Sequence, residues 1–360
     1  MNELLIKSSI RDYKVIFEKS VEGVTKAVEG LPNKVLVVDV NVLEIYRKEI
    51  EGIAEQGDII PFKAIEDNKD LEAVTDIYAD LIGRSAKRNI NLVSIGGGIT
   101  QDVTGFVAST LYRGINWTFV PTTFLAQTDS CIGSKTSLNF RNRKNLLGTF
   151  YPPSLIYLCP AFLSSLAEID YYSGIGETIK FQLMNPFVKP DLNDIGRKIE
   201  GLRRYESLDE VIRENMAVKI NYMENDEFDL GRRNLLNYGH CFGHALEISS
   251  GYDIPHGIAV SIGILFAGLV SVNRGMMSSS MFEGIRKIIL PCLPVKYDER
   301  HYDRDVLLSA MKNDKKRTGS RLSIVLSDND FMLGKYDDLE ENEFYQALQS
   351  LTETFGGITI

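Results

Sequence analysis

The sequence predicts an α/β protein with two domains, the first built on a parallel sheet and the second mostly α-helical. Three observations lead to this prediction. Strand-like and helix-like segments alternate along the first half of the chain, strand signals become sparse after about residue 160, and 360 residues exceed the roughly 250–300 that one core accommodates. We therefore expect a first domain over residues 1–160 and a second over residues 161–360.

Three apolar, β-branched runs predict the strands of the first domain, at residues 34–39, 90–95 and 117–120. The first run ends in a polar residue, the second is closed by glycines and the third stops at Pro121. Between the first two, residues 70–88 carry leucine, valine and isoleucine at helical spacing. Strands that alternate with helices indicate βαβ units, and hence a parallel sheet.

The second half has the periodicity of helices. We expect helices over residues 197–224, 234–251, 259–273 and 305–312, with a β-hairpin around residues 321–326. The sequence contains no internal repeat and no low-complexity linker.

The composition, 44% hydrophobic and 25% charged, is that of an ordinary globular protein. A net charge of −9 argues against nucleic acid as a partner, because phosphate backbones need a basic face. The four cysteines form no Cys-x-x-Cys pair, which excludes zinc-ribbon and disulfide-scaffold proteins. The N-terminus lacks the build of a signal peptide, and the best apolar run, residues 257–270, is shorter than a membrane span. We therefore expect a cytoplasmic protein that makes no use of a membrane.

A glycine triplet after the second predicted strand is typical of a pyrophosphate-binding turn. Gly96-Gly97-Gly98 would allow a close backbone approach, and the helix that follows, with Asp102, would offer free N–H groups to an anion. A simple tight turn is the alternative. Asp39 could bind a ribose hydroxyl or cap a helix, and Thr122 and Thr123 add hydroxyl groups at the same edge of the sheet.

Three of the four histidines lie between positions 240 and 256, which favours a metal site. His240 and His244 lie four residues apart on one helix face, so either both bind metal or one binds metal while the other handles protons. His256, on a loop before an apolar helix, could complete the site. Glu177 is the best carboxylate candidate, since it lies in an apolar, small-residue helix; an ion pair with Lys180 is the alternative.

Cations near glycines indicate an anionic substrate in spite of the net negative charge. Lys135 and Lys144, the latter followed by Asn145, are the best candidates, because small neighbours let an anion approach. Arg233 precedes the histidine segment, and Lys315, Lys316 and Arg317 form a basic run near the C-terminus.

Taken together, these motifs resemble 3-dehydroquinate synthase and the wider sugar phosphate cyclase family. The resemblance covers most of the chain, about residues 39–317. The matching blocks, in order, are Glu66-x-x-Lys69, Gly96-Gly97-Gly98-x-x-x-Asp102, Tyr112-Arg113-Gly114, Val120 to Ser130, Lys144 to Gly148, Gly176-Glu177-x-x-Lys180, Arg233 to His244 and His256-Gly257.

The resemblance implies a Rossmann-like first domain, a metal-binding helical domain and a role for each matching residue. It implies that zinc, with cobalt as a substitute, is bound by Glu177, His240 and His256, and that His244 handles protons. NAD would be held by Asp39, Glu66, Lys69, Gly96, Gly97, Gly98, Asp102, Thr122 and Thr123. The substrate would be met by Asp129, Lys135, Lys144, Asn145, Lys180, Lys219, Arg233, Asn237 and one of Lys315 and Lys316. Arg113 would reach into a partner subunit's site, which implies a homodimer.

The chemistry that the resemblance implies is the conversion of 3-deoxy-D-arabino-heptulosonate 7-phosphate to 3-dehydroquinate, in the shikimate pathway of aromatic amino acid biosynthesis. Transient oxidation by NAD would acidify a C–H bond, phosphate would leave, the hydride would return, and an intramolecular aldol reaction would close the carbocycle. NAD would not appear in the net reaction.

Three departures from the family pattern flank the expected substrate site. Ile258 stands where the family has glutamate, Ser134 where it has glycine, and Arg143 where glycine precedes the lysine. They leave open a cyclase that acts on sedoheptulose 7-phosphate or glucose 6-phosphate in secondary metabolism. A metal-dependent polyol dehydrogenase and a catalytically silent homologue used for binding are further alternatives, and the lysine set argues against the dehydrogenase.

Overall fold

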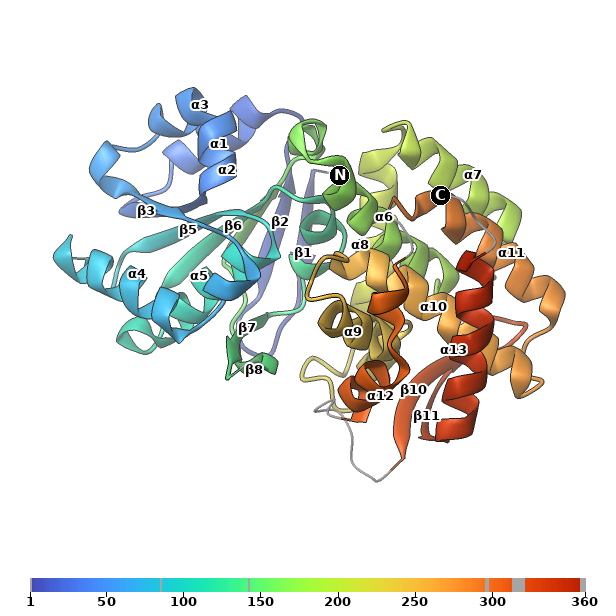
Figure 1. Ribbon diagram of the computed structural model, residues 1–360. Helices are drawn as coiled ribbons and strands as arrows, with labels where there is room; N and C mark the ends of the chain where they lie inside the picture. Colours follow the sequence, from blue (N-terminus) through green and yellow to red (C-terminus); the bar gives the residue numbers. More distant parts are fainter. Residues whose placement is uncertain (1, 85, 142, 295–297, 313–320, 357–360) are drawn as a thin grey trace. The chain divides into compact units, whose positions relative to one another are not determined.

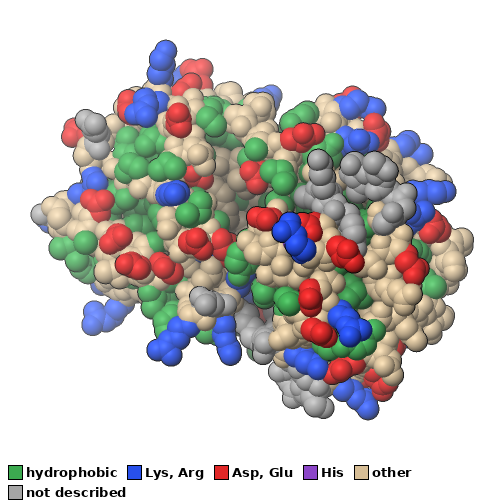
Figure 2. Space-filling model, viewed as in Figure 1, with side chains coloured by type: hydrophobic (Ala, Val, Ile, Leu, Met, Phe, Trp, Pro, Cys, Tyr) green, Lys and Arg blue, Asp and Glu red, His purple; other side chains and the backbone are tan. Residues whose placement is uncertain are grey.

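The structure is a computed structural model that describes residues 2–84, 86–141, 143–294, 298–312 and 321–356 (Figure 1). It divides into two compact units, Met1–Leu166 and Ala167–Ile360. On the face drawn in Figure 2, acidic and basic side chains are interspersed over the surface.

Within its described residues, the first unit is built on a seven-stranded sheet with the order β1-β2-β9-β6-β5-β3-β4. β1 runs antiparallel to β2, and every other neighbouring pair is parallel. The strands are β1 (Glu3–Ile6), β2 (Tyr13–Phe17), β3 (Lys34–Asp39), β4 (Ile59–Phe62), β5 (Asn91–Gly96), β6 (Asn116–Pro121) and β9 (Leu155–Leu158). A separate antiparallel hairpin joins β7 (Lys135–Phe140) to β8 (Arg143–Phe150).

Helices cover both faces of this sheet (Figure 1). They are α1 (Val21–Glu29), α2 (Val40–Ile45), α3 (Arg47–Glu51), α4 (Leu71–Gly83) and α5 (Gly98–Thr110). Leu36 and Val38 of β3 pack into one apolar core with side chains of α1, α2 and α3. Val35 and Val37 are equally buried, and they point to the opposite face because side chains alternate along a strand. Burial on both faces explains the continuous apolar run that predicted this strand.

The three predicted strands and the first predicted helix are present, with ends shifted by a few residues; the helix stops at Gly83 instead of residue 88. The prediction named no strand for β1, β2, β4, β9 or the β7–β8 hairpin. β4 illustrates the reason. It is four residues long and contains Pro61, which is tolerated because β4 lies at the edge of the sheet.

The second unit consists of helices around the buried helix α10 (His256–Asn273). The other elements are α6 (Glu168–Leu183), α7 (Leu192–Arg203), α8 (Leu208–Met223), α9 (His240–Ser249), α11 (Ser279–Ile289), α12 (Arg304–Lys312), α13 (Glu341–Gly356) and the antiparallel strands β10 (Leu322–Ser327) and β11 (Leu333–Leu339). α6, α9, α11, α13 and β10 all pack against α10.

Helix α10 is 18 residues long; it begins three residues before the predicted helix at residues 259–273 and ends at the same residue, Asn273. Among the described residues it is the helix that is long and apolar enough to cross a membrane, and 78% of that stretch is buried inside the protein. It starts at His256, so this histidine is the first residue of a helix rather than part of the preceding loop.

Two further helices were predicted as continuous and are interrupted in the structure. Residues 197–224 contain α7 and α8, separated where Tyr205 and Ser207 adopt positive φ angles of 61° and 57°. Residues 234–251 begin as the 3₁₀ segment Arg232–Asn237, and Gly239, with φ of +78°, precedes the start of α9. Left-handed residues end a helix, but helical periodicity on either side conceals them.

Candidate active site

The glycine triplet of the first unit lies at the junction of β5 and α5. Gly96 is the last residue of β5, Gly97 precedes the helix and Gly98 is its first residue. None of the three has a positive φ, so the need for glycine here is steric. A Cβ atom on Gly96 would lie 2.4 Å from Thr100 Oγ1, and one on Gly97 would lie 2.9 Å from Thr123 Cγ2. The turn thus combines a closely packed backbone with the N-terminus of a 13-residue helix, a combination suited to a phosphate group.

Two polar residues predicted at this edge of the sheet act as local caps. Asp39 ends β3, and its carboxylate accepts a hydrogen bond from Asn41 N at 2.9 Å, the capping role considered as an alternative. Thr123 Oγ1 accepts from Ala126 N at 3.2 Å and so supports the π-helical turn Ala126–Ser130, which contains Asp129. Thr122 is buried, and its N–H donates to Gly96 O, which ties the turn after β6 to the glycine triplet.

Five predicted site residues meet in one polar network in the first unit. Lys69 Nζ lies 2.6 Å from Asp102 Oδ2 and donates to Asn145 Oδ1 at 2.6 Å. Lys144 Nζ lies 3.5 Å from Glu66 Oε1. The structure therefore brings together residues that the family resemblance divided between NAD and substrate.

The network includes two residues that the sequence analysis missed, Ser137 and Asn139 of β7. Ser137 donates from both N and Oγ to the Asp102 carboxylate, at 3.0 and 2.9 Å. Asn139 Nδ2 donates to Glu66 Oε1 at 2.9 Å. Ser137 and Asn139 follow Lys135 at positions i+2 and i+4, so the three side chains lie on the same face of the strand. This spacing is the signal in the sequence that could have identified them.

Lys135 and Arg113 are exposed in the first unit. Arg113 belongs to the 3₁₀ turn Leu111–Arg113 and has φ of 63°, so its backbone is held in the left-handed region.

The second unit brings Glu177 and the histidines together through helix crossings at glycine. A Cβ atom on Gly176 of α6 would lie 2.0 Å from Gly257 O of α10, and one on Gly257 would lie 1.8 Å from Ser173 O of α6. The two helices therefore touch backbone to backbone. Because Gly176 and Gly257 are the immediate neighbours of Glu177 and His256, this contact sets the separation of the two functional side chains.

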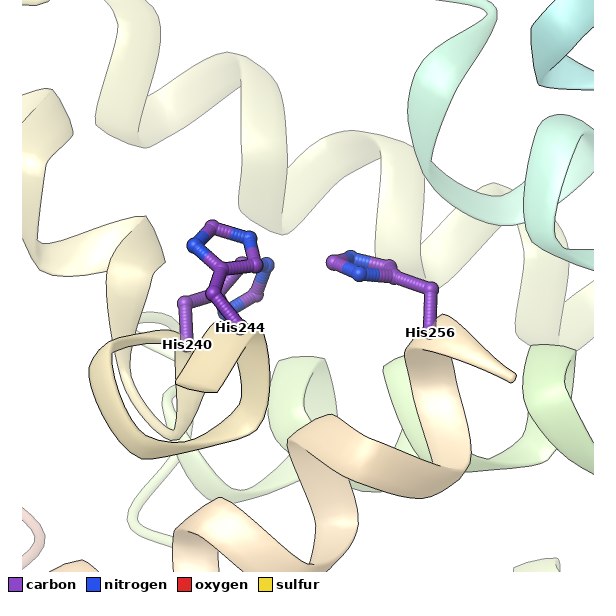
Figure 3. A group of neighbouring side chains, drawn as sticks. All are labelled: His240, His244 and His256. Atoms are coloured by element: carbon purple, nitrogen blue, oxygen red, sulfur yellow. The ribbon is translucent and has the colours of Figure 1, made fainter. Parts of the chain in front are cut away.

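Three imidazole rings converge from two helices (Figure 3). His240 and His244 come from the first turns of α9, and His256 comes from the start of α10. Ring centroids lie 5.1 Å apart for His240 and His256, and 5.5 Å apart for His244 and His256. One ligand nitrogen of each ring lies within 4.8 Å of the others, a spacing that could hold a metal ion.

Glu177 faces this cluster and fits the donor set of a divalent metal. Its side chain is fully buried, with Oε2 paired to Lys180 Nζ at 2.5 Å and Oε1 directed at the histidines. Oε1 lies 3.5 Å from Nε2 of His240 and 3.5 Å from Nε2 of His256. Two ligands that each lie about 2.1 Å from a tetrahedral zinc ion are about 3.4 Å apart. The distance of the oxygen from each of the two nitrogens is therefore the one that a zinc ion requires.

The charges of this group are strongly coupled. Burial opposes ionisation of Glu177, but Lys180, whose Nζ lies 2.5 Å from Oε2, and His256 lower the pKa of the carboxyl to about 2. Burial, with the nearby charge of Lys180, holds the pKa of His240 well below its usual range. Burial also opposes the charged form of His256, yet the carboxylates of Glu247 and Glu177 raise its pKa to about 10. His256 thus carries the positive charge that a metal bound at the same nitrogen would replace.

The remaining predicted residues of the second unit are mostly buried cations. Lys180 and Lys219 lie in α6 and α8 and are almost inaccessible to solvent. Arg233 is buried as well, and its guanidinium donates to Glu227 O. Asn237 Nδ2 donates to Asn234 O at 2.7 Å. Lys315 and Lys316 lie outside the described residues.

Two groups beside the histidines were not predicted. Tyr238 O accepts from Nδ1 of His240 at 3.1 Å, and Glu247 Oε2 lies 3.2 Å from Nδ1 of His256. Glu247 follows His240 and His244 at helical spacing, which is a signal that the sequence contains.

Comparison with known proteins connects both units to one family. Family models described as the N-terminal and C-terminal parts of 3-dehydroquinate synthase match residues 59–173 and 174–317. A 3-dehydroquinate synthase of Clostridium tetani (strain Massachusetts / E88) is 33% identical over 338 residues, which cover 91% of this chain and 89% of that protein.

Solved structures with the same fold include two other cyclases. One is 2-epi-5-epi-valiolone synthase from Streptomyces hygroscopicus subsp. jinggangensis 5008 with NAD⁺ and Zn²⁺ bound, at a TM-score of 0.83, 22% identity and coverage of 98% of this chain and 99% of that chain. The other is 2-deoxy-scyllo-inosose synthase complexed with carbaglucose-6-phosphate, NAD⁺ and Co²⁺, at a TM-score of 0.82, 22% identity and coverage of 97% and 99%. The fold class predicted from the sequence is confirmed.

Proposed function

Because the chain belongs to the 3-dehydroquinate synthase family, as its motifs predicted, we propose that it converts 3-deoxy-D-arabino-heptulosonate 7-phosphate to 3-dehydroquinate and phosphate. The family establishes a 3-dehydroquinate synthase-like sugar phosphate cyclase, a carbon–oxygen lyase. The observation that carries the choice of substrate is the similarity to relatives of that name over nearly the whole chain, at 33% identity against 22% for the two other cyclases.

NAD is the cofactor that we propose for the first unit. The glycine triplet and the N-terminus of α5 would hold its pyrophosphate, and Asp39 would meet a ribose hydroxyl. When bound, NAD supplies a reversible hydride acceptor. The Lys69–Asp102 pair would keep this side of the site rigid, because its charges are fixed by short contacts.

A divalent metal, Zn²⁺ with Co²⁺ as the substitute, is the second cofactor that we propose. Glu177, His240 and His256 would hold it, and when bound it supplies Lewis acidity toward a substrate oxygen. Lys180 would keep the Glu177 carboxylate ionised. His244, one helical turn from His240, would move a proton between its ring nitrogen and a substrate hydroxyl.

The cations would recognise a substrate with two anionic groups. Lys180, Lys219 and Arg233 are buried in the second unit, where an ammonium or guanidinium group strongly favours an anion. Lys135, Lys144 and Asn145 are the substrate-binding residues that we propose in the first unit, and one of Lys315 and Lys316 would meet phosphate. We also propose a homodimer in which Arg113, exposed on a constrained turn, reaches the partner's site.

A sugar phosphate without a carboxylate is the second candidate substrate, and Ile258 is the departure from the family pattern that leaves it open. Ile258 lies two residues after His256 and is fully buried, so at this position α10 contributes an apolar side chain where the family pattern has a carboxylate. Sedoheptulose 7-phosphate and glucose 6-phosphate are the substrates to compare.

The test is phosphate release by the zinc-loaded protein with NAD, given each of the three sugar phosphates in turn. Release from the heptulosonate alone, without accumulation of NADH, is the expected result. Release from a sugar phosphate without a carboxylate would support the second candidate substrate instead. Net formation of NADH would indicate a polyol dehydrogenase. His240→Ala should abolish release, whereas His301→Ala, which changes the histidine outside the cluster, should retain it.

A further inference from the structure

We propose that Glu247 is a positioning residue for the metal ligand His256, whose ring it holds in the tautomer and orientation that present Nε2 to Glu177. This inference deepens the proposed function and rests on it, because it assumes that the histidine cluster binds a metal.

The contact that carries the proposal joins Glu247 Oε2 to His256 Nδ1 at 3.2 Å. An ionised carboxylate only accepts hydrogen bonds, so Nδ1 must carry the proton. The lone pair of the neutral ring then lies on Nε2, the nitrogen that is 3.5 Å from Glu177 Oε1. A ring flipped by 180° about its Cβ–Cγ bond would place a carbon atom at each of these two positions, so the hydrogen bond to Glu247 and the nitrogen beside Glu177 would both be lost.

The position of Glu247 follows from the geometry of α9. His240, His244 and Glu247 lie at i, i+4 and i+7, so they share one face of the helix. The carbonyl of Glu247 accepts from Tyr252 N at 2.8 Å and from Ser250 Oγ at 3.1 Å, which fixes the backbone where the helix ends. The Glu247 side chain is 5% exposed and therefore lies in surroundings of low dielectric constant, where its interaction with an imidazole is strong.

A comparison with His240 supports the assignment. Nδ1 of His240 donates to the backbone carbonyl of Tyr238 at 3.1 Å, and its Nε2 also lies 3.5 Å from Glu177 Oε1. Both imidazoles are thus anchored at Nδ1 and present Nε2 to the same oxygen. The anchors differ in charge: a carboxylate makes the imidazole a stronger metal ligand than a carbonyl does.

The experiment measures zinc affinity by competition with a chromophoric chelator for the full-length protein and its variants. Glu247→Ala removes the anchor, and we expect zinc affinity to fall by about 10- to 100-fold. Glu247→Gln keeps the shape and an acceptor oxygen but loses the charge, so we expect a smaller loss, about 10-fold or less. Glu343→Gln, which changes a carboxylate paired with Arg274 elsewhere in this unit, should bind zinc as the wild type does.

The visible spectrum of the Co²⁺-loaded protein separates positioning from general stability. Glu247→Ala should change the bands, because they report the geometry of the ligands, and Glu247→Gln should restore them in large part. Thermal unfolding of the metal-free variants shows whether they remain folded. If Glu247→Ala does not fold, the fall in affinity of Glu247→Gln relative to Glu343→Gln decides.

The outcomes distinguish this proposal from the function on which it rests. Wild-type zinc affinity and an unchanged cobalt spectrum in the Glu247 variants would overturn the role of Glu247 alone. A wild-type protein that takes up neither Zn²⁺ nor Co²⁺ would overturn the metal site and this proposal with it. Intact metal binding without phosphate release would overturn the substrate assignment and leave the role of Glu247 standing.

Discussion

Replacement of Gly257 by alanine should separate the two helices that carry Glu177 and His256. The new Cβ would lie 1.8 Å from Ser173 O and 2.7 Å from Ser173 C, whereas real Cβ contacts are not shorter than 3.0 Å. Because the obstructing atoms belong to the backbone of α6, no side-chain rotation relieves the clash. The start of α10 must therefore move away by about 1.2 Å, the difference between 3.0 and 1.8 Å.

A displacement of this size is large for a metal site. The Nε2 atom of His256 is 3.5 Å from Glu177 Oε1, and metal–ligand distances tolerate changes of only about 0.2 Å. We expect Gly257→Ala to lose at least tenfold in zinc affinity. We also expect the free energy of unfolding of the metal-free protein to fall by about 1–3 kcal/mol, the usual effect of overpacking.

The assays are chelator competition for zinc and urea unfolding of the metal-free protein. Gly196→Ala is the matched control, since Gly196 lies inside α7 of the same unit and its new Cβ would meet only Ile288 Cγ1 at 3.8 Å. That variant should bind zinc normally and gain up to about 1 kcal/mol in stability, because alanine favours a helix over glycine. Wild-type zinc affinity in Gly257→Ala would refute the argument that the helix crossing sets the ligand spacing.

Three further predictions concern charge. Zinc binding at pH 8 should release about one proton, because the His256 pKa of about 10 keeps the ring protonated until the metal displaces the proton. Calorimetry in buffers of different ionisation enthalpy measures the number of protons released. A release of zero would contradict the prediction. In the metal-free protein, the raised pKa of His256 means that its stabilisation of the folded state is complete below pH 6.5 and is lost as the pH rises toward 10. The urea concentration at the unfolding midpoint should therefore fall over that pH range in the wild type. It should fall less in Glu247→Gln. Lys69→Met should lower the free energy of unfolding by about 2–3 kcal/mol, since it leaves the Asp102 carboxylate without its ammonium partner. Adding Asp102→Asn to this variant should recover part of the loss. If the effects of the two substitutions were additive, the two side chains would not form a direct pair.

The charge pattern around Glu177 explains why these experiments are informative. Glu177 and Glu247 are buried carboxylates, and the positive charges of Lys180 and His256 compensate them. His256 is the partner whose charge is removable, because a metal at Nε2 takes the place of its proton. Exchange of this proton for a divalent ion adds only one net positive charge beside two buried carboxylates, which lowers the electrostatic cost of metal binding.

The local errors of the sequence analysis have physical causes. Residues 197–224 and 234–251 are interrupted at Ser207 and Gly239, whose positive φ angles leave no mark in the spacing of the apolar residues on either side. Asp39 fits both a ribose ligand and a helix cap, and the hydrogen bond to Asn41 became visible only in the structure. Short edge strands such as β4 bury too few side chains to produce a clear alternation.

By itself, the sequence determined the fold class, the family and the residue types of the candidate site. The glycine triplet after β5, the histidines four apart and Glu177 in an apolar helix each follow from local chemistry and spacing, which the order of residues specifies directly. Only the tertiary structure decided that Lys69 pairs with Asp102, that Gly176 and Gly257 touch, and that Glu247 anchors His256. The reason is that periodicity reports which face of an element is buried, whereas the partner of that face depends on contacts between segments far apart in the chain.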